Sequence, residues 1–302
     1  MFNAPQIAAA CEIAATQEHP AHRWKPIRRL LLAVALAFGH DDSEAYSLRN
    51  MHTANTISIP HTTPHTMSFE NKVIIITGCS SGIGLATTQL LLQRGAKVFG
   101  IDIAPFTQDI AASTFTFHQV DLTKSNAADE AIAACVQKYG PKIDVLANVA
   151  GIMDAFSSAD TVKEAEWDRV ISINLTVPVR MMAAVLPSMK AHKGGVIVNV
   201  ASRAAVSGAC AGVAYTAIWG ADLCGGVATN IQSSIQKENW DMDGYMAAAG
   251  VIGLHTPSDA QGAPQLDISP DDVANAIVFL ASDEAKKING VLMPVDNAWS
   301  TI

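Results

Sequence analysis

Two side chains with the chemistry for proton transfer, Ser202 and Tyr215, stand thirteen positions apart in the sequence. A serine hydroxyl can hydrogen bond a reacting oxygen, and a phenol can act as a general acid or base. Trp219 follows Tyr215 by four positions, and its side chain offers no positive charge that would favour the phenolate. At the reference pKa of ~10, about one phenol in a thousand is ionised at pH 7. Taken singly, each residue also fits a structural role.

A second set of residues could bind a phosphate group. Thr77–Gly84 reads Thr-Gly-Cys-Ser-Ser-Gly-Ile-Gly and lies between an expected strand and an expected helix. Gly78, Gly82 and Gly84 let the backbone turn tightly and approach a pyrophosphate, which free N–H groups at the helix start would bind. Asp102, eighteen residues past Gly84, would accept hydrogen bonds from the adenosine ribose and repel a 2′-phosphate. We therefore expect NAD as the cofactor, with NADP possible; a plain glycine turn and an aspartate that caps a turn are the alternatives.

The elements that would position these residues alternate along the chain. Alternating strands and helices predict a parallel sheet with helices on both faces, because parallel crossovers are right-handed. We expect an α/β fold, a doubly wound Rossmann-type sheet in a single domain. The expected strands are Val73–Ile76, Lys97–Ile101, Ile143–Ala147 and Val196–Val200. The expected helices are 84–94, 126–139, 164–189 and 270–280, the last with Ser269 as its N-cap.

Ser202 and Tyr215 supply the first two residues of Ser-x12-Tyr-x3-Lys, the active-site signature of the short-chain dehydrogenase/reductase family. The chain resembles this family from about Phe69 to its end, and the spacing Gly-x3-Gly-x-Gly from Gly78 is similar to the family's own. Asp121-Leu122 resembles the pair that holds the adenine ring, and Asn148-Val-Ala-Gly151 resembles the Asn-Asn-Ala-Gly motif that lines the cofactor.

The resemblance implies a role for each site residue. Ser202 would polarise the substrate oxygen, and Tyr215 would exchange the hydroxyl proton while hydride moves to or from the nicotinamide. Asn174 matches the asparagine that anchors a water relay. The implied cofactor-binding residues are Gly78, Ser80, Ser81, Gly82, Ile83, Gly84, Asp102, Asp121, Leu122, Asn148, Ala150, Gly151, Tyr215, Val227 and Thr229.

The chain departs from the family after Tyr215. The family's lysine hydrogen bonds the nicotinamide ribose and lowers the tyrosine pKa, and Trp219 can do neither; Lys237, the next lysine, is interpreted as a solvated surface residue. Gly225–Thr229 resembles the loop that closes over the nicotinamide, yet only nine residues, Thr216–Cys224, separate it from Tyr215. A crossover needs at least about ten to twelve residues plus its strand. We therefore expect one helix and the sixth strand, about two dozen residues, to be absent.

The composition limits the possible partners. Hydrophobic residues make up 49% of the 302 residues and charged residues 16%, as in a well-buried globular protein. A net charge of −8 argues against nucleic acid, because its binders usually show a basic stripe. Five cysteines form no C-x-x-C pair and no zinc-like spacing, which predicts reduced thiols, no metal site and a cytoplasmic location.

Residues 1–66 differ from the rest, and we expect a disordered extension there, with targeting as the alternative, followed by the domain at 67–302. The apolar run Leu30–Phe38 has nine residues, too few for a helix across a bilayer core of about 30 Å, so we expect no membrane association. An anchor through this run is the alternative. Residues from about 230 to 266 would form the substrate lobe; Trp240 and Met242 there favour an apolar substrate or simply pack the lobe. After the lobe, Gly290–Asp296 resembles the family's last strand.

The expected function is an NAD(P)-dependent oxidoreductase that interconverts a secondary alcohol and a ketone on a small or medium apolar metabolite. The chain resembles fungal members that tailor secondary metabolites such as terpenoids. The alternative, raised by Trp219, is a nucleotide-binding but catalytically impaired pseudoenzyme or a mis-spliced product. Relatives are commonly homo-oligomers, but we expect poor assembly here because the dimerising helix is absent.

Overall fold

The computed structural model describes residues 67–110, 113–202, 204, 211–218, 229, 231–255 and 268–296, with the side chains of 218, 232 and 250–255 left out. The predicted extension, Trp219 and Val227 lie outside these residues.

A five-stranded parallel sheet in the order β3-β2-β1-β4-β5 forms the centre of the fold. Its strands are β1 (Val73–Thr77), β2 (Lys97–Asp102), β3 (Phe115–Gln119), β4 (Val145–Asn148) and β5 (Val196–Asn199). The predicted doubly wound α/β fold is confirmed. The sequence analysis did not predict β3, an edge strand in which Thr116, Phe117 and His118 are only half-buried and Gln119 is exposed.

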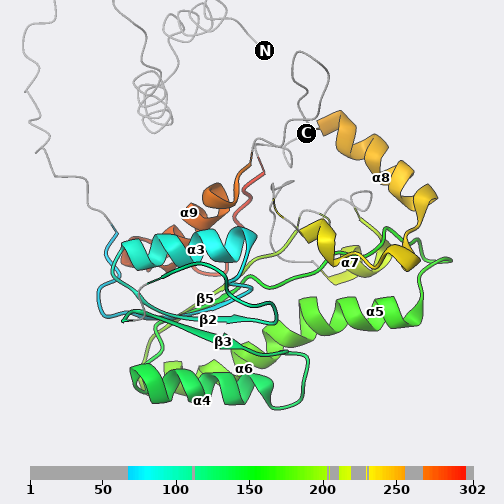
Figure 1. The fold of residues 1–302 in the computed structure, drawn as a ribbon. Coiled ribbons are helices and arrows are strands. Elements are labelled where there is room, and N and C mark those ends of the chain that lie inside the picture. Colours follow the sequence, from blue (N-terminus) through cyan, green and yellow to red (C-terminus); the bar gives the residue numbers. More distant parts are fainter. Residues whose placement is uncertain are drawn as a thin grey trace, which may run out of the picture. The chain divides into compact units, whose positions relative to one another are not determined.

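Helices cover both faces of the sheet (Figure 1). On one face lie α3 (Gly82–Gln93) and α9 (Pro270–Ala281), and on the other lie α4 (Ala127–Tyr139) and α6 (Val177–Ala191). Leu91 and Ile277 pack with one face of β1, while Ile132 and Met181 pack with the opposite face. As predicted, Ser269 caps α9, and its hydroxyl and Asp272 form a capping box.

The long predicted helix is interrupted. It consists of α5 (Glu164–Ile171), a π-helical turn (Ser172–Thr176) and α6. By length and composition the stretch Glu164–Ala191 could cross a membrane. However, Val177, Met181, Val185 and Met189 are buried within the apolar cluster that also holds Ile75 and Leu146 of the sheet, as in a core helix of a globular protein.

After β5, the described residues form helices and no further strand of the sheet. Besides α9, these are α7 (Val213–Ile218), α8 (Met242–His255) and 3-10 turns at Ile231–Ser234, Lys237–Asn239 and Asp283–Ala285. The predicted last strand at Gly290–Asp296 is wrong: the segment has one bridge residue, Val295, and no strand. A strand needs a neighbour for its backbone hydrogen bonds, and in the described part of the chain β5 is the final strand of the sheet.

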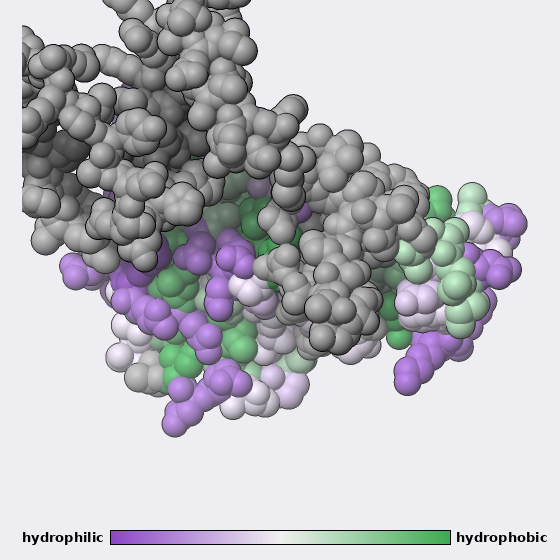
Figure 2. All heavy atoms as spheres, turned by 90° about the horizontal axis from the view of Figure 1, so that it is seen from above, coloured by the Kyte–Doolittle hydropathy of each residue, from purple (hydrophilic) through white to green (hydrophobic). Residues whose placement is uncertain are grey.

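Figure 2 looks onto the side of α3 and α9 and shows green hydrophobic residues between purple hydrophilic ones. In the C-terminal segment, Val291 and Leu292 are 46% and 40% exposed. These values fit a segment that lies outside the sheet of the described residues.

Candidate active site

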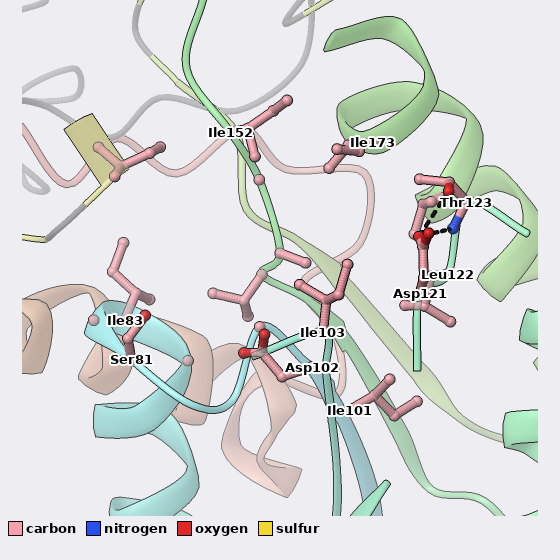
Figure 3. A pocket seen from close by; sticks show the side chains of 18 of the residues that line it. Ser81, Ile83, Ile101, Asp102, Ile103, Asp121, Leu122, Thr123, Ile152 and Ile173 are labelled. Atoms are coloured by element: carbon pink, nitrogen blue, oxygen red, sulfur yellow. Dashed lines mark hydrogen bonds between the residues drawn. The ribbon is translucent and has the colours of Figure 1, made fainter. Parts of the chain in front are cut away.

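A cavity of ≈ 240 Å³ opens at the carboxyl ends of β1, β2 and β4, the edge at which open α/β sheets bind ligands. Figure 3 shows side chains from the start of α3, the end of β2 and the loops after β3 and β4 around this space. The lining residues are Gly78, Ser81, Gly82, Ile83, Gly84, Ile101, Asp102, Ile103, Val120, Asp121, Leu122, Thr123, Val149, Ala150, Gly151, Ile152, Ile173, Val177, Thr229 and Ile231.

The glycine loop brings the backbone close to this cavity. Gly78 has φ +74°, and a Cβ there would lie 2.9 Å from Ala150 Cα. A Cβ on Gly84 would lie 2.0 Å from the carbonyl oxygen of Gly78. Helix α3 begins at Gly82, with no side-chain cap from Ser81, so the N–H groups of its first turn are available to an anion. This cradle fits the pyrophosphate of a dinucleotide.

Asp102 stands at the end of β2 with both carboxylate oxygens held by backbone. The N–H of Ser80 donates to Oδ2 at 2.9 Å, and the N–H of Ala104 donates to Oδ1 at 2.9 Å. Ser80 itself turns its hydroxyl to the carbonyl of Ala104, 3.1 Å away, and is not among the lining residues. Next to Asp102, Ile103 is 65% exposed and offers an apolar surface.

Asp121 and Leu122 line the cavity from the loop after β3. The N–H and Oγ1 of Thr123 donate to Asp121 Oδ1 at 3.0 and 2.6 Å (Figure 3). The hydroxyl bond is the main reason that the pKa of Asp121 lies below its usual value, and Lys124 at 3.5 Å adds to the shift. The carboxylate therefore stays charged and fixed at neutral pH.

The loop after β4 is tied to β1 by one hydroxyl. Thr77 Oγ1 accepts hydrogen bonds from the N–H groups of Val149 and Ala150 at 3.0 and 3.1 Å. Asn148 lies behind this loop, where its Nδ2 donates to Asn199 Oδ1 at 2.9 Å, and it does not line the cavity. The structure thus gives Asn148 a supporting position and Ala150 and Gly151 a lining position.

Asn174 lies in the π-helical turn and is buried. Its Oδ1 accepts from the N–H of Ile152 at 2.8 Å, and its Nδ2 donates to the carbonyl of Ile152 at 2.8 Å. π-turns recur at functional sites. Here the turn carries Asn174, whose two hydrogen bonds fix the backbone of Ile152, a lining residue. The water relay implied for Asn174 stays a prediction.

Tyr215 and the segment of Ser202 meet in one apolar cluster. Tyr215 in α7 is 8% exposed and is clustered with Ala201, Ala204 and Val170. Ser202 Oγ accepts from the N–H of Ala204 at 3.2 Å. The structure therefore brings together the parts of the chain that carry the two hydroxyls. Neither side chain is among those that line the cavity. Lys237 is exposed, in agreement with its interpretation as a surface residue.

Most of the predicted cofactor residues line the cavity, whereas Ser80, Asn148 and Tyr215 do not and Val227 lies outside the described residues. Sequence reasoning missed several apolar lining residues, among them Ile152, Ile173 and Ile231. Isoleucines in expected elements carry no sign of which side faces a ligand. Ile173 lies in the π-turn that interrupts the predicted helix.

The chain is similar to known proteins over most of its length. The family model described as short chain dehydrogenase matches residues 72–221 and so ends six residues after Tyr215. The short-chain dehydrogenase/reductase olcF of Penicillium canescens is 42% identical over 255 positions, which cover 77% of this chain and 98% of the relative. The short chain dehydrogenase ple7 of Rhodocybe pseudopiperita is also 42% identical, over 77% of this chain and 100% of the relative. Both relatives are named as dehydrogenases, so they do not support the alternative of a catalytically impaired protein.

The alignment with olcF is longer than the stretch of this chain that it covers. Since 77% of 302 residues is about 233, about 22 of the 255 positions are gaps in this chain. This agrees in size with the segment expected to be absent after Tyr215. Among solved structures, levodione reductase matches with a TM-score of 0.65 at 24% identity, over 77% of this chain and 99% of that one. At that identity the likeness supports the fold alone.

Proposed function

Because the chain belongs to the short-chain dehydrogenase family, a family of NAD(P)-dependent oxidoreductases, we propose that it interconverts a secondary alcohol and a ketone with NAD as its preferred cofactor. The proposed substrate is a small or medium apolar metabolite of fungal secondary metabolism, a terpenoid being the favoured class. The relatives olcF and prhI come from Penicillium species, which supports the fungal setting. We place the activity in the cytoplasm, without a nucleic-acid or membrane partner.

The observation that carries the proposal is the joint placement of the α3 N-terminus and Asp102 at one cavity. The N–H groups of α3 would hold the pyrophosphate, and the Asp102 carboxylate would accept from the ribose hydroxyls. A phosphate on the ribose would meet a fixed negative charge instead. This supports NAD over NADP, although a structural relative described as a gluconate 5-dehydrogenase carries bound NADP.

A bound nicotinamide supplies or accepts the hydride. The residues of this chain then have two tasks: Ser202 would orient the substrate oxygen, and Tyr215 would hold or accept its proton. Burial of Tyr215 among Ala201, Ala204 and Val170 excludes water from the proton donor's surroundings. Position 219 provides no cation, so we expect a turnover that is slow for the family.

An aromatic group supports an apolar substrate. Phe156, Trp240 and Tyr245 form a mutual cluster with ring centroids 5.1 to 5.7 Å apart. Met153 packs against the same cluster, and Met242 and Met246 are exposed on α8 beside it. Flexible methionines next to rigid aromatic rings form an adaptable apolar surface. A polycyclic hydrocarbon skeleton would match it better than a charged sugar or acid.

The cofactor proposal is tested by titrating the protein with NADH and NADPH and following tryptophan fluorescence. We expect NADH to bind at least ~10-fold more tightly, a difference of ~1.4 kcal/mol. Asp102→Asn should remove most of this preference, and Asp109→Asn, an exposed aspartate on the following loop, should leave it unchanged. Stronger binding of NADPH to the unaltered protein would refute the cofactor assignment. Turnover of apolar cyclic ketones with the bound cofactor then tests the reaction.

A further inference from the structure

Asp154 is a fully buried carboxylate whose position is explained by neither nucleotide binding nor the Ser202 and Tyr215 pair. It lies after β4 with 1% of its surface exposed. Its Oδ1 accepts from the N–H groups of Phe156 at 3.2 Å and Gly212 at 3.0 Å. Its Oδ2 accepts from the N–H of Tyr215 at 2.9 Å. Two of these three donors lie about sixty residues away, in and just before α7.

The bonded groups are the ones that a helix N-terminus leaves without partners. Helix α7 begins at Val213, so Gly212 precedes it and Tyr215 lies in its first turn, where N–H groups have no intrahelical acceptor. An N-cap side chain normally accepts such a bond, and glycine at 212 has none. The carboxylate of Asp154 takes this place from another part of the chain. The carbonyl of Ser157 completes the cap by accepting from the N–H of Val213 at 2.8 Å.

Any side chain at position 212 would displace the Asp154 carboxylate or the adjoining backbone. A Cβ on Gly212 would lie 2.6 Å from Asp154 Oδ2 and 2.7 Å from the carbonyl carbon of Phe156. Phe156 itself has φ +65°, which is strained for an aromatic residue. Such strain persists only where surrounding contacts impose it. The turn from Asp154 to Ser157 is thus pressed against the start of α7.

The same turn also contacts the substrate lobe. A Cβ on Gly244 of α8 would lie 2.1 Å from the carbonyl oxygen of Phe156, and the ring of Phe156 contacts Trp240 at a tilt and Tyr245 edge to face. Movement of the lobe would therefore be felt at the Asp154 turn, which holds the backbone of Tyr215.

Backbone hydrogen bonds stabilise the charged form of the buried Asp154 carboxylate. Burial raises the pKa of Asp154, the three backbone N–H bonds oppose that rise, and the nearby charge of Glu166 adds to it. Glu166, also 1% exposed, accepts from the N–H of Ala155 at 2.5 Å and the hydroxyl of Ser157 at 3.1 Å. Arg169 lies against the same turn, with Nη2 3.5 Å from the carbonyl of Met153. A buried carboxylate pair beside one guanidinium is costly unless it is well hydrogen-bonded, which indicates a specific role.

We propose that Asp154 is a positioning residue for Tyr215: its carboxylate caps α7 from the loop after β4 and thereby fixes the phenol beside the segment of Ser202. The catalytic role of Tyr215 rests on the proposed function, whereas the hydrogen bonds of Asp154 to α7 are independent of it. Truncating or altering this carboxylate should displace the tyrosine while the nucleotide cavity, formed by other residues, is kept.

Asp154→Asn is the most selective change. Its amide oxygen can still accept from Phe156 and Gly212, but its NH₂ group then faces the N–H of Tyr215, donor against donor. We expect kcat to fall at least ~10-fold, with the affinity for NADH within about 2-fold of the unaltered protein. Asp168→Asn, an exposed aspartate on the neighbouring α5, is the matched control and should change neither quantity.

A measurement without turnover separates this inference from the proposed function. Nitration of tyrosines by tetranitromethane, located by mass spectrometry, should be several-fold faster at Tyr215 in Asp154→Asn, relative to half-buried Tyr139 in the same molecule. General destabilisation would raise both rates together. Gly212→Ala, which displaces the carboxylate without removing its charge, should give the same change if Asp154→Asn does not fold. A Tyr215 to Tyr139 ratio that stays at its original value in the variants would overturn the inference, whether or not the protein turns over a ketone.

Discussion

The nucleotide half of the molecule and the region from β5 onward differ in how deeply their strands are buried. All five residues of β1 are buried, whereas only one of the four residues of β5 is. The glycine loop packs against the loop after β4, and Asp102 and Asp121 each accept hydrogen bonds at the carboxyl edge of the sheet. Tyr215, by contrast, depends on a carboxylate from a distant loop. The cofactor cavity is therefore built on the buried central strands, whereas the backbone of Tyr215 is held by a carboxylate on a loop outside the sheet.

Tyr215→Phe is expected to have the largest effect, because it should lower the reaction rate and leave the affinity for NADH unchanged. Loss of a general acid or base typically lowers the rate by 10² to 10⁴. The phenol does not line the nucleotide cavity, so the affinity for NADH should stay within about 2-fold. Single-turnover oxidation of NADH with an apolar ketone and a parallel fluorescence titration measure both. Equal losses in rate and in affinity would show that the two regions act as one.

The reverse separation is expected from Gly84→Ala. The added methyl would lie 2.0 Å from the carbonyl oxygen of Gly78, so the loop must open and the N–H cradle is lost. We expect NADH affinity to fall at least ~100-fold, or ~2.7 kcal/mol, with a loss of unfolding free energy of about 1–3 kcal/mol. Gly194→Ala is the control, because nothing lies within 4 Å of its added Cβ. Unchanged NADH binding in Gly84→Ala would remove the loop from the cofactor site.

A smaller effect of the opposite sign is expected beside β5, the last strand of the sheet in the described residues. Val198, Ala276, Ile277, Met293 and Val295 line a narrow apolar cavity of ≈ 50 Å³ between β5, α9 and the C-terminal segment. Ala276→Leu should fill part of it and raise the unfolding free energy by about 0.5–2 kcal/mol. Ala274→Leu, at a fully buried site on the same helix, should instead lower it by about 1–3 kcal/mol. Chemical denaturation measures both, and equal effects would mean that the β5 edge is as well packed as the rest.

The sequence predicts the nucleotide half well because its signals are local. A strand, a glycine turn and a helix start follow one another at Thr77–Gly84, and Asp102 ends the next strand, so their meeting at one sheet edge follows from parallel topology alone. Strand β3 was missed although Phe115-Thr-Phe-His-Gln119 alternates aromatic with polar residues, the pattern of a half-buried edge strand. The strand predicted at Gly290–Asp296 was wrong because an apolar run is strand-like only where a partner strand exists.

Asp154 shows what sequence reasoning could not reach. Nothing in Ile152-Met-Asp154-Ala sets this aspartate apart from any polar loop residue, and its partners are backbone N–H groups 58 and 61 positions later. Backbone donors leave no mark in a sequence. The glycines at 212 and 244 were the available signal, since both permit close approach, but the segment they approach is identified only in three dimensions.

The smallest effect should come from the C-terminal segment, where Leu292→Ala can be compared with Leu91→Ala in α3. Leu91 is 1% exposed, and its truncation should cost about 2–5 kcal/mol. Leu292 is 40% exposed, so little of its side chain leaves water on folding, and we expect a change within about 0.5 kcal/mol. Denaturant titration of the two variants gives the difference directly. A loss above ~2 kcal/mol for Leu292→Ala would mean that the segment is buried in solution. It would then pair as a strand at the edge of the sheet. The difference in burial between the two halves would then hold for a single chain and not for an oligomer in which this edge is covered.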